Sequence, residues 1–118
     1  MARYQENRTP LQPFVGTAEE TGEGISVSGL ARLKNCGAIS PYGIYAKPCR
    51  GDRVGVIPME GYGYLYLGQV QDLTGLKEGE IRLISKGGAE IRLLENGEIS
   101  LNGLMITKDG KWKENSSG

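Results

Sequence analysis

Hydrophobic and polar residues alternate most regularly near the C-terminal end of the chain, where a four-residue phrase occurs three times. The copies are EIRL at 80–83, EIRL at 90–93 and EISL at 98–101, so the spacing is ten and then eight residues. A period of two predicts β-strands, because successive side chains of a strand point to opposite faces. Similar turn sequences, SKGG and then ENG, separate the copies. The segment therefore predicts a repeating unit of short strands.

Each copy of the phrase predicts one apolar and one polar face. The predicted apolar face carries Ile81, Leu83, Ile91, Leu93, Ile99 and Leu101. The predicted polar face carries Glu80, Arg82, Glu90, Arg92, Glu98 and Ser100. Pairs of Glu and Arg on neighbouring strands are each worth about 0.2–1 kcal/mol. Full burial of one large aliphatic side chain gains about 1.5–3 kcal/mol, so on the order of 10 kcal/mol depends on what covers the apolar face.

Two covers for this apolar face are consistent with the sequence. The meander either packs on the preceding part of its own chain or is covered by the same segment of other copies. The few apolar residues upstream favour the second cover, in which three copies form a triangular prism with an aliphatic axis and a charged exterior. Such a prism also hides strand edges. Leu104, Met105 and Ile106 are three apolar residues in a row, and they indicate that register is lost there.

The preceding part of the chain predicts a small barrel. A period-2 pattern starts at Gly24, and prolines and glycines at 41, 43, 48 and 51 separate further short strand pieces. The residues at 53–57 form a further predicted strand, and Tyr62, Tyr64 and Tyr66 alternate with smaller or aliphatic residues. About five short strands with turn signals between them predict a five-stranded barrel of the OB type. No window has a convincing helical period, so the predicted class is all-β.

These patterns divide the chain into four segments. Residues 1–20 are polar and contain Pro10, Pro13 and Gly16, which indicates an extended N-terminal arm or a frayed terminus. The predicted barrel occupies 21–75 and the predicted trimeric segment 76–106. Residues 107–118 are predicted to be a tip segment followed by a flexible tail. Met105, Ile106 and Trp112 are candidate tip residues, although Trp112 is equally suited to anchor a partner or to be an exposed packing residue.

Composition and charge exclude several classes of function. Lys plus Arg and Asp plus Glu both number 14, so the net charge is zero and the basic surplus of a nucleic-acid binder is missing. The 19 glycines fit turn-rich β-structure. The chain has no apolar run long enough for a membrane helix, and its N-terminus lacks the apolar core of a signal peptide. We therefore expect assembly in a cytoplasm.

The sequence contains no constellation of residues typical of catalysis or metal binding. It has no histidine, which removes the usual general base and any Cys/His zinc site within one chain. Cys36 and Cys49 are expected to be reduced thiols in or near a core, with a disulfide as the alternative. We therefore expect neither an enzyme nor a cofactor or metal site.

An aromatic stripe raises a second functional hypothesis. OB folds bind single-stranded nucleic acid by stacking bases on aromatic rings, and Tyr62, Tyr64 and Tyr66 could serve this way. Barrel packing or a trimer contact explains the same stripe, and only three cations lie nearby: Lys47, Arg50 and Arg53. The alternative function is thus an OB-fold binding module for single-stranded nucleic acid or a protein partner.

Two stretches together resemble a known family. SPYGIYAKPCRGDRVGVIPM at 40–59, followed by GEIRLISKGGAEIRLLENGEISLNG at 79–103, resembles the baseplate spike proteins of contractile phage tails. Within that family the chain is similar to the phage Mu-like spike and baseplate assembly protein V group, which also occurs in tail-like bacteriocins. The resemblance covers roughly 22–106. The first stretch is similar to the turn-and-strand pattern of the OB domain, and the second to the strand that leads into the β-helix.

The resemblance implies a homotrimer with an OB-fold collar and a short, intertwined, triple-stranded β-helix. Such a spike caps the tail tube and is driven through the target envelope when the sheath contracts. Its implied partners are its own copies, tail tube and baseplate proteins, and a separate tip protein where the tip is not closed by the chain itself. Its implied place is the baseplate of a virion or tail-like particle. Several relatives bind iron at the tip through a His-x-His motif, and this chain, without histidine, lacks that site.

Overall fold

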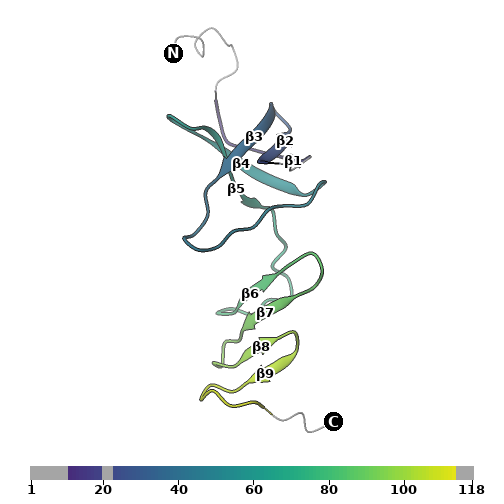
Figure 1. Ribbon diagram of the computed structural model, residues 1–118, viewed down its shortest axis with the longest axis vertical. Helices are drawn as coiled ribbons and strands as arrows, with labels where there is room; N and C mark the ends of the chain where they lie inside the picture. Colours follow the sequence, from purple (N-terminus) through teal and green to yellow (C-terminus); the bar gives the residue numbers. More distant parts are fainter. Residues whose placement is uncertain (1–10, 20–22, 114–118) are drawn as a thin grey trace. The chain divides into compact units, whose positions relative to one another are not determined.

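The computed structural model describes residues 11–19 and 23–113, which belong to two compact units that divide between Gln71 and Asp72. All regular secondary structure in these residues is β-strand (Figure 1), which confirms the predicted all-β class. The first unit contains a closed five-stranded barrel and the second a four-stranded sheet. Within the described ranges, no helix is suited to crossing a membrane.

The barrel is built from five short strands joined in an OB-like order. The strands are β1 (Phe14–Ala18), β2 (Ile25–Ser28), β3 (Arg32–Ala38), β4 (Arg53–Met59) and β5 (Gly63–Gln69). Their spatial order is β1-β2-β3-β5-β4, and β1 pairs with β4 to close the barrel. The pairing of β3 with β5 is parallel and the others are antiparallel. Closure pairs both edges of every strand, so the barrel presents no open sheet edge.

A small aliphatic core fills the barrel. Val27, Val54 and Val56 are completely buried, and Tyr66 closes the core with its ring. Alternation explains the pattern on β4, because Val54 and Val56 point inward and Gly55 between them points outward. Burial raises the pKa of the Tyr66 hydroxyl above its usual value, with a smaller contribution from the nearby Asp52 carboxylate.

The first strand corrects one predicted boundary. Residues 14–18 were expected in an N-terminal arm that ended at residue 20, yet they form β1 and pair with both β2 and β4. Gly16 faces the interior, where a Cβ would lie 2.6 Å from Val27 Cγ1 and 2.7 Å from the Ser28 carbonyl oxygen. The glycine that looked like a loop signal therefore permits close packing in a strand. Residues 1–10 of the predicted arm lie outside the described part of the structure.

The segment between β3 and β4 corrects a second expectation. The short strand pieces predicted around Pro41 and Pro48 are absent, and residues 39–52 form an irregular loop that projects from the barrel (Figure 1). Proline cannot donate a ladder hydrogen bond, and Gly43 and Gly51 adopt positive φ angles of 84° and 95°. These residues mark turns within one loop, and the missing fifth strand is β1.

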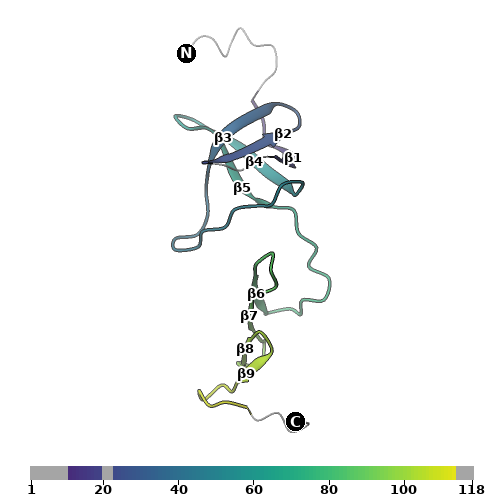
Figure 2. The ribbon, with the colours of Figure 1, turned by 45° about the vertical axis from the view of Figure 1, so that its right-hand side comes forward.

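The second unit is an antiparallel meander of four very short strands. They are β6 (Ile81–Ile84), β7 (Glu90–Leu93), β8 (Ile99–Leu101) and β9 (Leu104–Ile106), and they pair in chain order. Figure 2 shows this sheet as a single layer. The three predicted strands are therefore confirmed, and the predicted boundary at 75/76 lies four residues after the division between the two units.

The fourth strand overturns the expected loss of register. Asn102 and Gly103 both have positive φ angles, 51° and 90°, and form a two-residue turn between β8 and β9. This conformation is the one that a type I′ hairpin turn requires. The turn pairs Leu101 with Leu104 and Ile99 with Ile106, so the alternation restarts on the same face. Leu104, Met105 and Ile106 therefore form a regular strand, in which Met105 points to the face opposite to its two neighbours.

We expect Gly16→Ala to destabilise the barrel by about 1–3 kcal/mol, because its Cβ would overlap the Val27 side chain and the Ser28 backbone. All six tyrosines precede residue 72, so in a Trp112→Phe background near-ultraviolet circular dichroism during denaturant unfolding reports on the barrel. Thr17→Ala, on the same strand but facing outward, is the control and should have a smaller effect. Equal stability of Gly16→Ala and the parent chain would contradict the assignment of Gly16 to a packed strand.

Candidate functional site

The register of the second sheet brings all six predicted apolar residues to one face. Cross-strand pairs join Ile81 to Leu93, Leu83 to Ile91, Ile91 to Leu101 and Leu93 to Ile99. Directly paired residues share a face, so the six side chains form one continuous surface. The turn at 102–103 adds two residues that were not predicted to belong to it, Leu104 and Ile106. We call these eight residues the aliphatic face.

Most of the aliphatic face is open to solvent in a single chain. Six of its residues are 37% to 56% exposed: Ile81, Leu83, Ile91, Leu93, Leu101 and Leu104. Ile99 and Ile106 are half-buried. A single-layer sheet of this kind has no second layer that could bury its apolar side. Contiguous exposed apolar surface on this scale marks an interaction site in a soluble protein.

The opposite face carries ion pairs and one exposed aliphatic residue, Ile84, which pairs with Glu90 and is 56% exposed. The Arg82 guanidinium forms an ion pair with Glu90, and Lys113 Nζ lies 3.2 Å from a Glu98 carboxylate oxygen. The predicted pairing of Glu with Arg is confirmed for Arg82, whereas Arg92 lies directly opposite Arg82. Exposed ion pairs contribute about 0–1 kcal/mol each, so they shape the surface more than they stabilise it. Ser100 is buried on this face, and its Oγ accepts a hydrogen bond from the Gly103 N–H at 3.1 Å.

The predicted tip residues are placed on different sides of the sheet. Ile106 belongs to the aliphatic face, and Met105 pairs with Ser100 on the opposite face. Trp112 forms an isolated bridge with Ile106, and its side chain is exposed. A turn over 107–111 returns the chain, and the Lys113 N–H donates to the Met105 carbonyl at 2.9 Å. The last described segment therefore lies along the outer edge of β9, while residues 114–118 are outside the described part.

Asn102 ties the last turn to an earlier strand. Its Oδ1 accepts a hydrogen bond from the Glu90 N–H at 2.7 Å, and its own N–H donates to the Glu90 carbonyl at 3.0 Å. Asparagine tolerates the left-handed conformation better than most residues, and here its side chain also replaces a missing ladder partner. The β8–β9 turn is thus fixed to the start of β7.

The predicted tyrosine stripe is not a single exposed surface. Tyr66 belongs to the core, and Tyr64 packs edge-to-face on Phe14 with ring centroids 5.5 Å apart. The Tyr64 hydroxyl also donates to the Gln12 carbonyl oxygen at 3.1 Å. Tyr62 lies in the turn before β5 and is exposed. The exposed aromatic residues that the sequence did not single out are Tyr42 and Tyr45, in the loop before β4.

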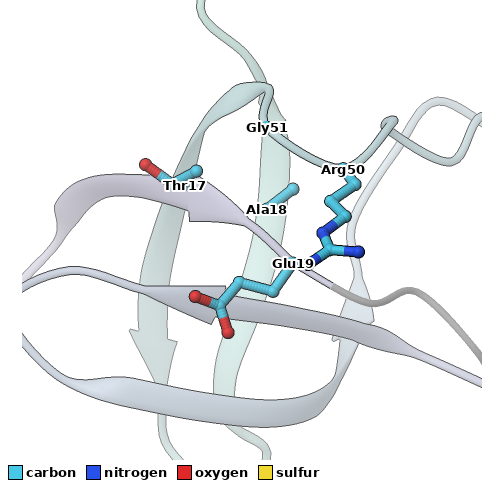
Figure 3. Close-up of a pocket in the computed structure, with 5 residues that line it drawn as sticks. All are labelled: Thr17, Ala18, Glu19, Arg50 and Gly51. Atoms are coloured by element: carbon cyan, nitrogen blue, oxygen red, sulfur yellow. The ribbon is translucent and has the colours of Figure 1, made fainter.

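A surface hollow of about 360 Å³ lies at the end of β1 (Figure 3). It is lined by Thr17, Ala18, Glu19, Arg50 and Gly51. The Gly51 N–H donates to the Ala18 carbonyl at 2.8 Å, which holds the loop against the strand. Glu19 and Arg50 bring one charge of each sign to the hollow, and Thr17 brings a hydroxyl, but the lining includes no second carboxylate.

The described residues show no arrangement suited to holding a metal ion. In 11–19 and 23–113, no three of the Cys, Asp and Glu side chains come together in a group of that kind. Cys36 is buried in the barrel and Cys49 is half-buried in the following loop, and both are free thiols. Burial raises the pKa of the Cys36 thiol above its usual value.

Comparison with known proteins leaves the geometry as the basis for assigning a function. The chain matches no protein-family model, and a search of curated proteins finds no match.

We expect Asn102→Ala to destabilise the second unit by about 1–2 kcal/mol, because alanine disfavours the left-handed conformation and the Oδ1 bond to Glu90 is lost. The only tryptophan, Trp112, lies in this unit, so its fluorescence during denaturant unfolding measures the change. Asn102→Gly loses the hydrogen bond but keeps the turn, and should cost less. Equal losses for the two variants would show that the backbone conformation contributes nothing.

The two thiols should differ in their reactivity toward a disulfide reagent such as DTNB. Cys36 is buried and its pKa is raised, so at neutral pH it has less thiolate and less access than an exposed cysteine. We expect one faster reaction from Cys49 and one slow reaction that accelerates when denaturant unfolds the barrel. In Cys49→Ser only the slow reaction should remain. A fast reaction of Cys36 in the folded Cys49→Ser chain would contradict its burial.

Proposed function

We propose that the protein is the central spike of a contractile tail or tail-like injection particle, assembled as a homotrimer through the aliphatic face of β6–β9. The supporting observation is the aliphatic face itself: eight apolar residues share one side of a single-layer sheet, and six of them are exposed. Burying them would gain on the order of 10 kcal/mol per chain. The cover is two further copies of the same sheet.

The width of the strands favours three copies over two. Each strand has three or four residues, which at about 3.3 Å per residue gives a wall about 10–13 Å wide. Each strand directs only two apolar side chains to the aliphatic face. Each of these side chains therefore lies beside one of the two long margins of the sheet, where the strands end. A two-layer sandwich would leave both margins open. Three walls can meet at their margins as a triangle, so that the side chains of each wall are covered by those of the other two.

The chemistry of the two faces agrees with this arrangement. The aliphatic face contains no titratable group, so its cover needs no matching charges and its burial leaves no ion unpaired. The opposite face carries Arg82, Glu90, Arg92 and Glu98, which keep the outside of a prism soluble. In such a prism the four strands of each wall follow one another along the axis, because short turns join them in chain order.

The proposed role is mechanical. A spike driven by sheath contraction needs stiffness, and hydrogen-bonded short strands around a dry axis supply it. The stretches 40–59 and 79–103 resemble phage Mu-like spike and baseplate assembly V proteins, which supports this role. The resemblance implies intertwined chains, whereas β6–β9 of one chain pair with one another, so each chain contributes one wall of the proposed prism. On this proposal the barrel faces the tail tube and baseplate proteins, the tip meets the target envelope or a separate tip protein, and the protein is not an enzyme.

An OB-like binding module is the alternative function. Arg32 and Lys34 are exposed on β3, and the exposed Tyr62 lies in the β4–β5 turn. Oligonucleotide-binding OB folds use this part of the barrel, namely strands 2–3 and the loop between strands 4 and 5. Binding of a fluorescent single-stranded oligonucleotide, followed by anisotropy, separates the two proposals, since a spike should show none.

Ile91→Glu combined with Leu93→Glu should convert the trimer into monomers, because six carboxylates would have to enter the apolar axis. Multi-angle light scattering should then give 12.8 kDa in place of three times that mass. The matched control is Lys77→Gln with Lys86→Gln, which also lowers the net charge by two but lies in exposed turns. The control should remain trimeric, and its barrel and that of the Glu variant should keep the tyrosine signal of the parent.

A parent chain of 12.8 kDa would contradict the proposal directly. So would a double-Glu variant that keeps the mass of the parent oligomer, since the aliphatic face would then not be the contact.

A further inference from the structure

Trp112 lies on the same side of the second sheet as the aliphatic face. It forms a bridge with Ile106, and directly paired residues share a face. The next residue supports this placement, because the Lys113 N–H donates to the Met105 carbonyl at 2.9 Å and Lys113 Nζ reaches Glu98 on the opposite face. Side chains alternate along an extended segment, so Trp112 points to the aliphatic side. The sheet thus gains a further row, which holds a single large ring.

One ladder of paired residues runs across the whole sheet and ends at this ring. Its members, each paired with the next, are Ile81, Leu93, Ile99, Ile106 and Trp112. The first four belong to the aliphatic face, and their side chains contain no polar atom. Trp112 lies at the end of the sheet opposite to β6 and is 63% exposed in a single chain. The apolar column that the proposed trimer buries therefore ends in an exposed aromatic ring.

The backbone around Trp112 is held by hydrogen bonds on both sides, although its ring is exposed. In the turn before it, the Thr107 N–H donates to the Lys111 carbonyl at 2.7 Å, and the Gly110 N–H donates to the Thr107 carbonyl at 2.8 Å. The Thr107 hydroxyl oxygen accepts a further hydrogen bond from the Lys111 N–H at 3.2 Å. After it, the Lys113 N–H is bound to β9. A ring on such a fixed segment loses little entropy on binding, and tryptophan is a frequent hot-spot residue of interfaces.

We propose that Trp112 of three copies closes the end of the apolar axis, so that the chain forms its own tip. In closed cyclic symmetry, a residue beside the axis meets the same residue of the other copies. The indole ring suits the last row, because it combines a large apolar body with one N–H donor and is favoured where one side is apolar and the other is wet. The inner rows of the prism have no wet side, and they contain only aliphatic residues.

The cap rests on the proposed trimer, which brings the three rings together, and it goes further by closing the tip without a second protein. A prism with an open end leaves its last aliphatic row in contact with water. Burial of an aromatic side chain removes about 150–250 Å² from water, so three rings can cover that row. Met105 cannot take this role, since it points to the opposite face with Ser100.

The test measures quenching of tryptophan fluorescence by acrylamide in the full-length chain, where Trp112 is the only tryptophan. We expect a quenching constant roughly threefold or more below that of N-acetyltryptophanamide, the fully exposed reference, because the quencher does not reach a buried indole. The matched control moves the tryptophan by one residue, in a chain with Lys111→Trp and Trp112→Phe. Residue 111 faces the other way, so its tryptophan should be quenched nearly as well as the reference. Light scattering checks that both chains are trimers of 12.8 kDa subunits.

The outcomes separate the cap from the proposed function. A trimer whose Trp112 is quenched as strongly as the reference would overturn the cap and leave the spike proposal standing, with the ring exposed to a separate tip protein. Equal shielding of tryptophan at 111 and at 112 would also overturn it, since the protection would not depend on the face. So would shielding that persists in the monomeric chain with Ile91→Glu and Leu93→Glu, since the ring would then pack on its own chain. A parent chain that is a monomer would overturn both proposals.

Discussion

The structure of the second unit depends on one constraint: an apolar sheet face only two side chains wide must be covered. A wide sheet can bury its centre under a single helix or a second layer, but here every apolar side chain lies at a margin. In the proposed trimer, three walls around an axis satisfy the constraint with one sequence and no added layer. On this proposal symmetry replaces a larger core, and the 118-residue chain needs few apolar residues beyond the small core of its barrel.

The two units solve the problem of open strand edges differently. The barrel pairs β1 with β4, so closure within one chain satisfies all five strands. The second sheet leaves β6 as an edge, while the segment at 107–113 lies along β9 and is joined to it by the bridge between Ile106 and Trp112. The first unit is complete as one copy, whereas the second has an uncovered face. The proposed assembly therefore involves the second unit, because its apolar face is the one left uncovered.

Alternation in the sequence predicted the elements whose partners are near in the chain. The phrase at 80–83, 90–93 and 98–101 gave strands, faces and turns correctly, since hairpin register follows from local spacing. It failed at β1, where Gly16 looked like a loop signal because its partners Val27 and Ser28 are distant in sequence. It failed at β9 because Asn102–Gly103 restarts the alternation. The alternation could not predict what covers the aliphatic face, since one sequence cannot distinguish contacts within a chain from contacts between copies.

Glycines show why local sequence is insufficient, because the same residue answers three different demands. Gly103 supplies a positive φ, and Gly16 removes a Cβ that would overlap neighbouring atoms inside the barrel. Gly55 and Gly68 do neither, and they lie where the register of β4 and β5 shifts, at the kind of bulge that glycine in a strand often marks. Gly16 and the Gly55–Gly68 pair take their roles from pairing partners on other strands. The strand register therefore distinguishes these uses of glycine, and the local sequence does not.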